Sequence, residues 1–229
     1  MLTLFALFLD LDGTLLNTEE LKWRSHRKTV FDLRADWKLS DDEYLRLIGK
    51  SSQDAVAFIC KKCGLDTTIT YVGYRHRFDI NYKDLLRKEA RAHDGVLNFL
   101  CLARNQGIKT VVVSSSTTEE VILALQKTGL ADEIDRMVSA DDVRSPKPNP
   151  EPYFAALAHV PGATNRNSLA LEDTEAGLSS AICAGLKVIG VLHPLNPHQD
   201  LRAAKRTIRK ERFTDADGLL RLFNNILSS

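Results

Sequence analysis

The sequence lacks the features that would direct it to a membrane or to nucleic acid. Its 229 residues carry a formal net charge of only +1, which creates no global attraction to nucleic acid or to an acidic membrane surface. No segment approaches the roughly 18 consecutive apolar residues that a membrane span requires. The apolar run from Leu2 to Leu9 is too short for a signal peptide and has no basic residues before it. We therefore expect a globular, cytoplasmic protein that binds neither nucleic acid nor a membrane.

Cysteine is scarce, and the motifs of several cofactor sites are absent. Cys60 and Cys63 form a CKKC sequence, but no second Cys or His pair at zinc-like spacing accompanies it. We interpret these two as reduced thiols at the end of a helix that Gly64 closes, and we expect Cys101 and Cys183 on apolar helix faces. The absence of GxxxxGK[ST] excludes a P-loop nucleotide site, and the six histidines show no HExxH or comparable ligand spacing.

The second half of the chain alternates short apolar runs with helical patterns. The apolar runs are Leu4–Leu9, Ile108–Val113, Arg136–Ser139, Ser168–Leu171 and Lys187–Leu192. Each has the length and composition of a strand that is buried on both faces. The segments between them have apolar residues at helical spacing and end at glycines. This pattern predicts an α/β fold with a Rossmann-like, mainly parallel sheet between two helical layers.

The stretch of residues 17–90 differs from the rest of the chain. It is rich in charged residues, has apolar positions at helical spacing and contains no convincing strand. We therefore expect an α-helical domain inserted after the first strand. The predicted boundaries are residues 1–16 and 91–229 for the α/β core and residues 17–90 for the helical insert.

Polar residues follow the predicted strands at the points where those strands end. In an open parallel sheet, ligands bind at the carboxyl ends of the strands. The residues expected there are Asp10, Asp12, Ser114, Lys147, Glu172 and Asp173. Clustered carboxylates repel each other unless a cation such as Mg²⁺ is shared between them. Hydroxyl and ammonium donors beside Mg²⁺ suit a phosphoryl group, whose transfer depends on positioning and charge stabilisation.

The same segments resemble a known family. DLDGT, a strand ending in serine, KPNPEPY and LEDTEAG are similar, in this order, to the four motifs of the haloacid dehalogenase superfamily. The helical insert after the first motif resembles the subgroup of phosphoglycolate phosphatases and β-phosphoglucomutase. The resemblance covers nearly the whole chain and implies a phosphatase that acts on a phosphomonoester through an aspartyl-phosphate, with the insert as a cap over the site.

The resemblance also implies a role for each motif residue. Asp10 corresponds to the nucleophile, and Asp12 to the acid and base that protonates the leaving oxygen and then activates water. Ser114, Ser115 and Lys147 correspond to the groups that bind the transferring phosphoryl. The implied Mg²⁺ ligands are Asp10, the backbone carbonyl of Asp12, Glu172 and Asp173. Dehalogenases of the family lack the second aspartate, so Asp12 favours phosphoester chemistry.

The residues of the helical insert do not identify the substrate. Lys22 and Lys50 are the candidates for substrate contact from the insert. Mutase-like relatives usually have Asp in place of Asn17, His in place of Lys22 and often an aliphatic residue in place of Thr14, so these positions favour a phosphatase over a sugar-phosphate mutase. A mutase and, more remotely, a catalytically inactive binding module remain the alternatives. We expect a small phosphorylated metabolite as the partner and either a monomer or a homodimer.

Overall fold

A computed structural model describes residues 3–228, which contain one parallel six-stranded sheet. The strands lie in the order β3-β2-β1-β4-β5-β6, and each neighbouring pair is parallel. Their bounds are β1 Ala6–Leu9, β2 Lys109–Val113, β3 Arg136–Val138, β4 Ser168–Glu172, β5 Lys187–Leu192 and β6 Arg206–Arg209. Strands β2 and β3 lie on one side of β1, and strands β4, β5 and β6 lie on the other. The order of the strands in the sheet therefore changes direction between β1 and β4, which is where ligands bind in such sheets. The predicted α/β fold class is confirmed.

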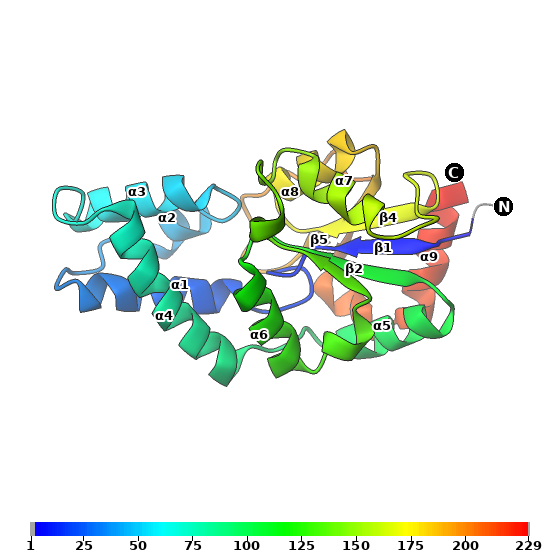
Figure 1. Cartoon of the computed structure of the whole chain (residues 1–229), viewed down its shortest axis with the longest axis horizontal. Helices are drawn as coiled ribbons and strands as arrows, with labels where there is room; N and C mark the ends of the chain where they lie inside the picture. Colours follow the sequence, from blue (N-terminus) through cyan, green and yellow to red (C-terminus); the bar gives the residue numbers. More distant parts are fainter. Residues whose placement is uncertain (1–2, 229) are drawn as a thin grey trace.

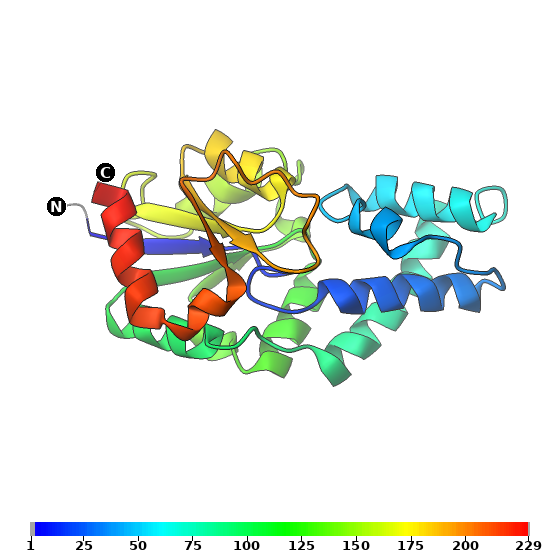
Figure 2. The same ribbon diagram turned by 180° about the vertical axis from the view of Figure 1, so that it is seen from behind.

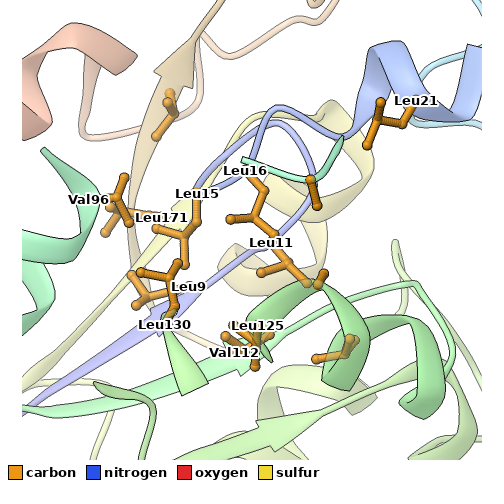
Figure 3. Packing of buried hydrophobic residues seen from close by; sticks show 14 of the residues in the cluster. Leu9, Leu11, Leu15, Leu16, Leu21, Val96, Val112, Leu125, Leu130 and Leu171 are labelled. Carbon is orange, nitrogen blue, oxygen red and sulfur yellow. The ribbon is translucent and has the colours of Figure 1, made fainter. Parts of the chain in front are cut away.

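Helices cover both faces of the sheet (Figure 1). One face packs against α5 (Val96–Asn105), α6 (Thr118–Thr128) and α9 (Ala216–Ser228), and the other against α7 (Glu151–Ala158) and α8 (Glu175–Cys183). The alternation of side chains along β1 explains this, since Leu7 and Leu9 enter the first cluster while Ala6 and Phe8 enter the second. Burial of each large apolar side chain contributes roughly 1.5–3 kcal/mol. Figure 3 shows Leu9 beside Val112 and Leu171 in the first cluster.

Strand β6 was not predicted from the sequence. Its four residues read RTIR, and Ile208 is the only one of them that is buried. An edge strand has one neighbour and little apolar surface to hide, so its sequence carries a weak signal. Three short 3₁₀ helices, which the sequence also did not indicate, complete the core: Ala131–Glu133, Ala140–Asp142 and Lys210–Thr214.

Four helices between β1 and α5 form a separate layer, which we call the four-helix segment: α1 (Glu19–Asp32), α2 (Asp41–Leu45), α3 (Ser52–Cys63) and α4 (Tyr71–Glu89). Figures 1 and 2 place it beyond the carboxyl ends of the strands, at the opposite end of the molecule from the two termini. The two connections to the core run side by side. Asn17 donates its N–H to the carbonyl of Arg91, and His93 donates its N–H to the carbonyl of Leu15.

The interior of the four-helix segment is aromatic. The ring of His26 lies 4.2 Å from that of Phe78 and bonds through Nδ1 to the hydroxyl of Tyr74 at 3.0 Å. Burial, helped by the nearby charges of Arg75 and Lys22, lowers the pKa of His26 to about 3, so this histidine is a neutral packing residue at ordinary pH.

The cysteines follow the expectation with one exception. Cys60 and Cys63 are buried, free thiols near the end of α3, which Gly64 closes in the left-handed conformation. Cys101 is partly buried, whereas Cys183 is exposed at the end of α8, so its expected place in the core is wrong.

No described helix combines the length and the apolar character that crossing a membrane requires.

Glycine is required at position 95 for two reasons that can be separated by experiment. Gly95 has a φ of +86° and a Cβ built there meets the backbone of Phe213 at 2.5 Å, whereas Gly64 has a φ of +75° with nothing within 4 Å. We expect Gly64→Ala to lower the free energy of unfolding by about 1 kcal/mol through backbone strain alone. Gly95→Ala should lower it by about 3 kcal/mol or more, because steric overlap adds to the strain. Urea denaturation measures both, and equal losses would contradict the packing argument.

Candidate active site

The loop after β1 brings two carboxylates to the carboxyl edge of the sheet. The N–H of Asp10 donates to the carbonyl of Leu171 at 3.0 Å, which continues the pairing with β4. The chain then turns at Gly13 and returns, so that Asp12 and Leu16 form a short parallel bridge. Asp10 and Asp12 are 8% and 9% exposed, so both charges are nearly removed from water and need partners.

Lys147 supplies the positive charge at this edge. Its Nζ lies 2.7 Å from Asp10 Oδ1 and 2.6 Å from Glu172 Oε1, and it donates to the carbonyl of Val113 at 2.7 Å. Burial alone would lower the pKa of this ammonium, but Asp10 and Glu172 overcome that effect and leave the pKa raised. Lys147 is therefore a permanent cation that joins the ends of β1, β2 and β4.

Three buried carboxylates at this edge could share a metal ion. Asp10, Glu172 and Asp173 each offer an oxygen atom within 4.8 Å of the others. Burial raises the pKa of Glu172 to about 8, in spite of Lys147 and with the help of Asp10 and Asp173. Burial and the Asp10 charge raise the pKa of Asp173 as well. One lysine thus does not neutralise three carboxylates that lie so close together.

The hydrogen bonding of the two carboxylate oxygens of Glu172 indicates whether the site suits a cation. Oε1 accepts from Lys147 and from the hydroxyl of Tyr153, whereas the buried Oε2 has no hydrogen-bond partner among the described residues. A buried carboxylate oxygen without a partner is unfavourable. An all-oxygen set of carboxylates with unmet charge matches the preference of a hard divalent cation, so the residues present fit such an ion.

Asp12 faces the four-helix segment and the loop after β2. Oδ1 accepts from the hydroxyls of Thr18 at 2.5 Å and Tyr82 at 3.2 Å. Oδ2 accepts from the hydroxyl of Ser116 at 2.7 Å and lies 3.1 Å from Lys22 Nζ. Burial would raise the pKa of Asp12, but Lys22 and the hydroxyl donors outweigh burial and lower it. Asp12 is therefore ionised in this arrangement.

The serines after β2 occupy different positions. Ser114 is 3% exposed, donates its N–H to the carbonyl of Val138 and accepts the N–H of Ser116 on its Oγ at 3.0 Å. Ser115 is exposed and Ser116 contacts Asp12. The capping box of Thr117 and Glu120 starts α6 immediately afterwards. The N–H groups of Ser114, Ser116 and Thr117 have acceptors within the protein, so among the described residues of this turn the N–H of Ser115 is the one that can bind an anion.

A cavity of about 500 Å³ lies between the four-helix segment and the core. Both Lys22 and Lys50 line it, together with Ser115 and Ser116. Its further walls mix polar, aromatic and aliphatic residues: Glu19, His26, Tyr44, Leu47, Ile48, Gly49, Ser52, Ala55, Tyr71, Arg75, Phe78, Asp79, Tyr82, Thr117, Glu120 and Ala140. A larger surface hollow of about 920 Å³ beside β6 and α9 contains none of the predicted site residues. Asp10, Asp12, Ser114, Lys147, Glu172 and Asp173 do not line the smaller cavity. Two of its lining residues, Lys22 and Ser116, contact Asp12, so the cavity adjoins the carboxylates and is the candidate site for the rest of the substrate.

Several residues of the site carried no usable sequence signal. Thr18 and Tyr82 contact Asp12, Tyr153 contacts Glu172, and His193 contacts Asp173 with Nε2 at 2.9 Å from Oδ2. They lie at the start of α1, within α4, within α7 and just after β5. Their partners are between 6 and 70 positions away in the chain, so only folding reveals the contacts.

Buried carboxylates and an ammonium meet at the carboxyl edge of a parallel sheet, where such folds bind their ligands, and the comparisons identify the chain as a member of a hydrolase family. The model of the haloacid dehalogenase-like hydrolase family matches residues 7–191. The chain belongs to this family, which confirms the resemblance seen in its motifs.

Individual relatives are similar over most of the chain. Pyrophosphatase PpaX of Bacillus pumilus is 31% identical over 189 residues, which are 82% of this chain and 83% of that protein. The phosphorylated carbohydrates phosphatase of Thermotoga maritima is 24% identical over 200 residues, 87% of this chain and 90% of that protein. The crystal structure of β-phosphoglucomutase from Clostridium difficile matches with a TM-score of 0.80 at 19% identity, covering 99% of this chain and 100% of the other. The similarity to the β-phosphoglucomutase structure shows that the two chains share a fold.

Removing the shared ammonium should destabilise the folded protein. We expect Lys147→Met to lower the free energy of unfolding by roughly 3–5 kcal/mol, because Asp10 and Glu172 would stay buried without their partner. The matched control is Lys83→Met, which removes an ammonium whose partner, Glu119, has a side chain that is 56% exposed. It should lose about 1 kcal/mol or less. Urea denaturation in the presence of a chelator measures both, and similar losses would contradict the central position of Lys147.

Proposed function

We propose that this protein is a Mg²⁺-dependent phosphatase that hydrolyses a small phosphorylated metabolite through an aspartyl-phosphate. The observation that carries the proposal is the meeting of Asp10, Glu172 and Asp173 within 4.8 Å beside the ammonium of Lys147. Carboxylates that a cation can bridge, next to fixed donors, are suited to hold and transfer a phosphoryl group. Family membership supports the same chemistry.

Asp10 and Asp12 divide the reaction between them. Asp10 attacks phosphorus, so that a bond forms between its oxygen and phosphorus while the bond from phosphorus to the ester oxygen breaks. For this step Asp12 must first take up a proton from solvent, because it is ionised in the described arrangement, and it then gives that proton to the departing oxygen. The carboxylate that remains then takes a proton from water, which attacks phosphorus and releases Asp10 and inorganic phosphate. Lys22 and the hydroxyls of Thr18 and Ser116 favour the ionised Asp12 that this second step needs.

The other motif residues bind the phosphoryl group and the metal. Ser114 donates its hydroxyl and Ser115 its backbone N–H to the phosphoryl oxygens, and Lys147 supplies positive charge beside them and donates once it exchanges one of its three acceptors. The ligands for Mg²⁺ are Asp10, Glu172, Asp173 and the backbone carbonyl of Asp12. When bound, the cation neutralises charge on the phosphoryl group and on the carboxylates. Lys147 also lowers the electrostatic repulsion between the incoming phosphate and Asp10.

The four-helix segment serves as the cap, and its boundaries are residues 17–90 between core segments 1–16 and 91–229. Lys22 and Lys50 line the cavity of about 500 Å³ and contact the substrate from the cap side. The name of the Thermotoga maritima relative, a phosphatase of phosphorylated carbohydrates, supports a small phosphorylated metabolite as substrate. A sugar-phosphate mutase is the alternative, because a β-phosphoglucomutase shares the fold.

A phosphate-release screen tests the function. With Mg²⁺ present, the protein should release inorganic phosphate from a generic aryl phosphate and from members of a panel of phosphorylated metabolites. A chelator should stop turnover, and added Mg²⁺ should restore it. Product analysis on glucose 1-phosphate distinguishes the alternative, since a mutase forms glucose 6-phosphate where a phosphatase forms free glucose and phosphate. No release across the panel would favour a catalytically inactive binding module.

The nucleophile can be tested by a nearly isosteric change. We expect Asp10→Asn to fold normally and to lose activity by about a thousand-fold or more, because an amide oxygen is a poor nucleophile. Acid quenching of the wild type during turnover should trap labelled phosphate on the protein, and the variant should trap none. Asp66→Asn is the control, because Asp66 is exposed and lies outside the cavity lining. An active Asp10→Asn protein would refute the assignment.

A further inference from the structure

A loop after β5 contacts one of the buried carboxylates from outside the family motifs. His193 Nε2 lies 2.9 Å from Asp173 Oδ2, and the two side chains are only 3% and 1% exposed. The position follows from the sheet, because β5 lies beside β4 with Glu172 opposite Gly190. The residues that follow these two strands therefore meet at the same edge of the sheet.

The hydrogen bonds of the ring assign the proton on His193. The N–H of Leu195 points to Nδ1 at 3.3 Å, so Nδ1 is the acceptor. Nε2 then carries the proton and donates it to Asp173. A ring nitrogen that carries a proton has no free lone pair for a metal ion. The ring is therefore a hydrogen-bond donor to the carboxylate and not a ligand itself.

Asn196 holds the same loop and the same aspartate. Its side-chain oxygen accepts the N–H of His193 at 3.0 Å. Its side-chain nitrogen donates to the carbonyls of Asp173 and Val191, both at 2.9 Å. Asn196 is 3% exposed, so these bonds are shielded from water. The loop thus contacts Asp173 at its backbone through Asn196 and at its side chain through His193.

The loop after β1 contacts the Asp173 carboxylate from the side opposite His193. Thr14 donates its hydroxyl to Asp173 Oδ1 at 3.2 Å. A Cβ at Gly13 would come within 2.4 Å of Asp173 Oδ2 and 2.9 Å of His193 Nε2. The pair of Asp173 and His193 therefore packs directly on the backbone of the loop that carries Asp12. One donor on each oxygen still leaves lone pairs for a cation.

We propose that His193 is a positioning residue, which holds the Asp173 carboxylate in the orientation that binds the divalent cation. The inference rests on the proposed metal site and extends it to a residue outside the four motifs. Donors that fix a ligating carboxylate beforehand reduce the reorganisation that metal binding requires, and loss of such a partner typically weakens metal affinity by about 10- to 100-fold. His193 acts on the reaction only through Asp173.

Titration of Mg²⁺ or Mn²⁺ into metal-free protein, without substrate, measures this effect directly. We expect His193→Leu to raise the dissociation constant by about 10- to 100-fold. His193→Gln should stay within about threefold of wild type, because its amide nitrogen can donate from the position of Nε2. His198→Leu is the matched control, since His198 lies in the same loop, partly exposed, and contacts Asp42 instead. Its metal affinity should equal that of the wild type.

Two further readouts separate positioning from a general structural defect. At saturating Mg²⁺, His193→Leu should recover kcat to within about threefold, while the Mg²⁺ concentration for half activation rises in parallel with the dissociation constant. Nitrogen chemical shifts of the wild-type ring should show the proton on Nε2, and this measurement does not depend on whether a variant folds.

The outcomes distinguish the inference from the proposed function. If the wild type binds the metal and His193→Leu binds it with the same affinity, the inference about His193 is overturned but the proposed metal site is not. A His193→Gln protein as weak as His193→Leu, or a proton on Nδ1, also overturns it. A wild-type protein that binds no divalent cation overturns the proposed Mg²⁺ site and the inference together.

Discussion

The acidic edge of the sheet depends on one ammonium group. Lys147 Nζ contacts Asp10, Glu172 and the carbonyl of Val113 within 2.7 Å, so it joins three strands at the point where they end. A buried charge is stable only with a partner. The same arrangement leaves part of the carboxylate charge unmet, because Asp173 shares the site and Glu172 Oε2 has no hydrogen-bond partner among the described residues. This unmet carboxylate charge suits the edge to a divalent cation.

The second aspartate links this chemistry to the four-helix segment. Asp12 is bonded by Thr18, Lys22 and Tyr82, which come from the start of α1, from α1 itself and from α4. Motion of the four-helix segment relative to the core would therefore change the donors around Asp12 and, with them, its pKa. Ion pairs such as that of Lys83 with Glu119 also join α4 to α6. The ionisation of Asp12 in this structure thus depends on groups that the four-helix segment supplies.

Sequence patterns predicted the central strands well because those strands are buried on both faces. A short, continuous apolar run such as that ending at Leu9 is stable mainly as a strand that helices cover on both faces. The pattern failed where burial is slight: β6 exposes most of its side chains, and Cys183 proved to be exposed at the end of a helix. The motif residues Asp10, Lys147, Glu172 and Asp173 lie together at one edge of the sheet, while their roles stay predictions. Their contacts with Tyr153 and His193 were not predictable, because hydrogen bonds between distant residues leave no periodic signal.

The sequence by itself determined the class of fold, the order of the motifs and the identity of the charged groups at the strand ends. Hydrophobic periodicity and strand-end placement are local properties, and one chain displays them. Only the tertiary structure decided how those charges are balanced: Lys147 between two carboxylates, Asp12 turned toward Lys22, and Asp173 held between Thr14 and His193. The reason is physical, since the pKa and the orientation of a buried carboxylate depend on partners a few ångströms away in space, wherever those partners lie in the chain.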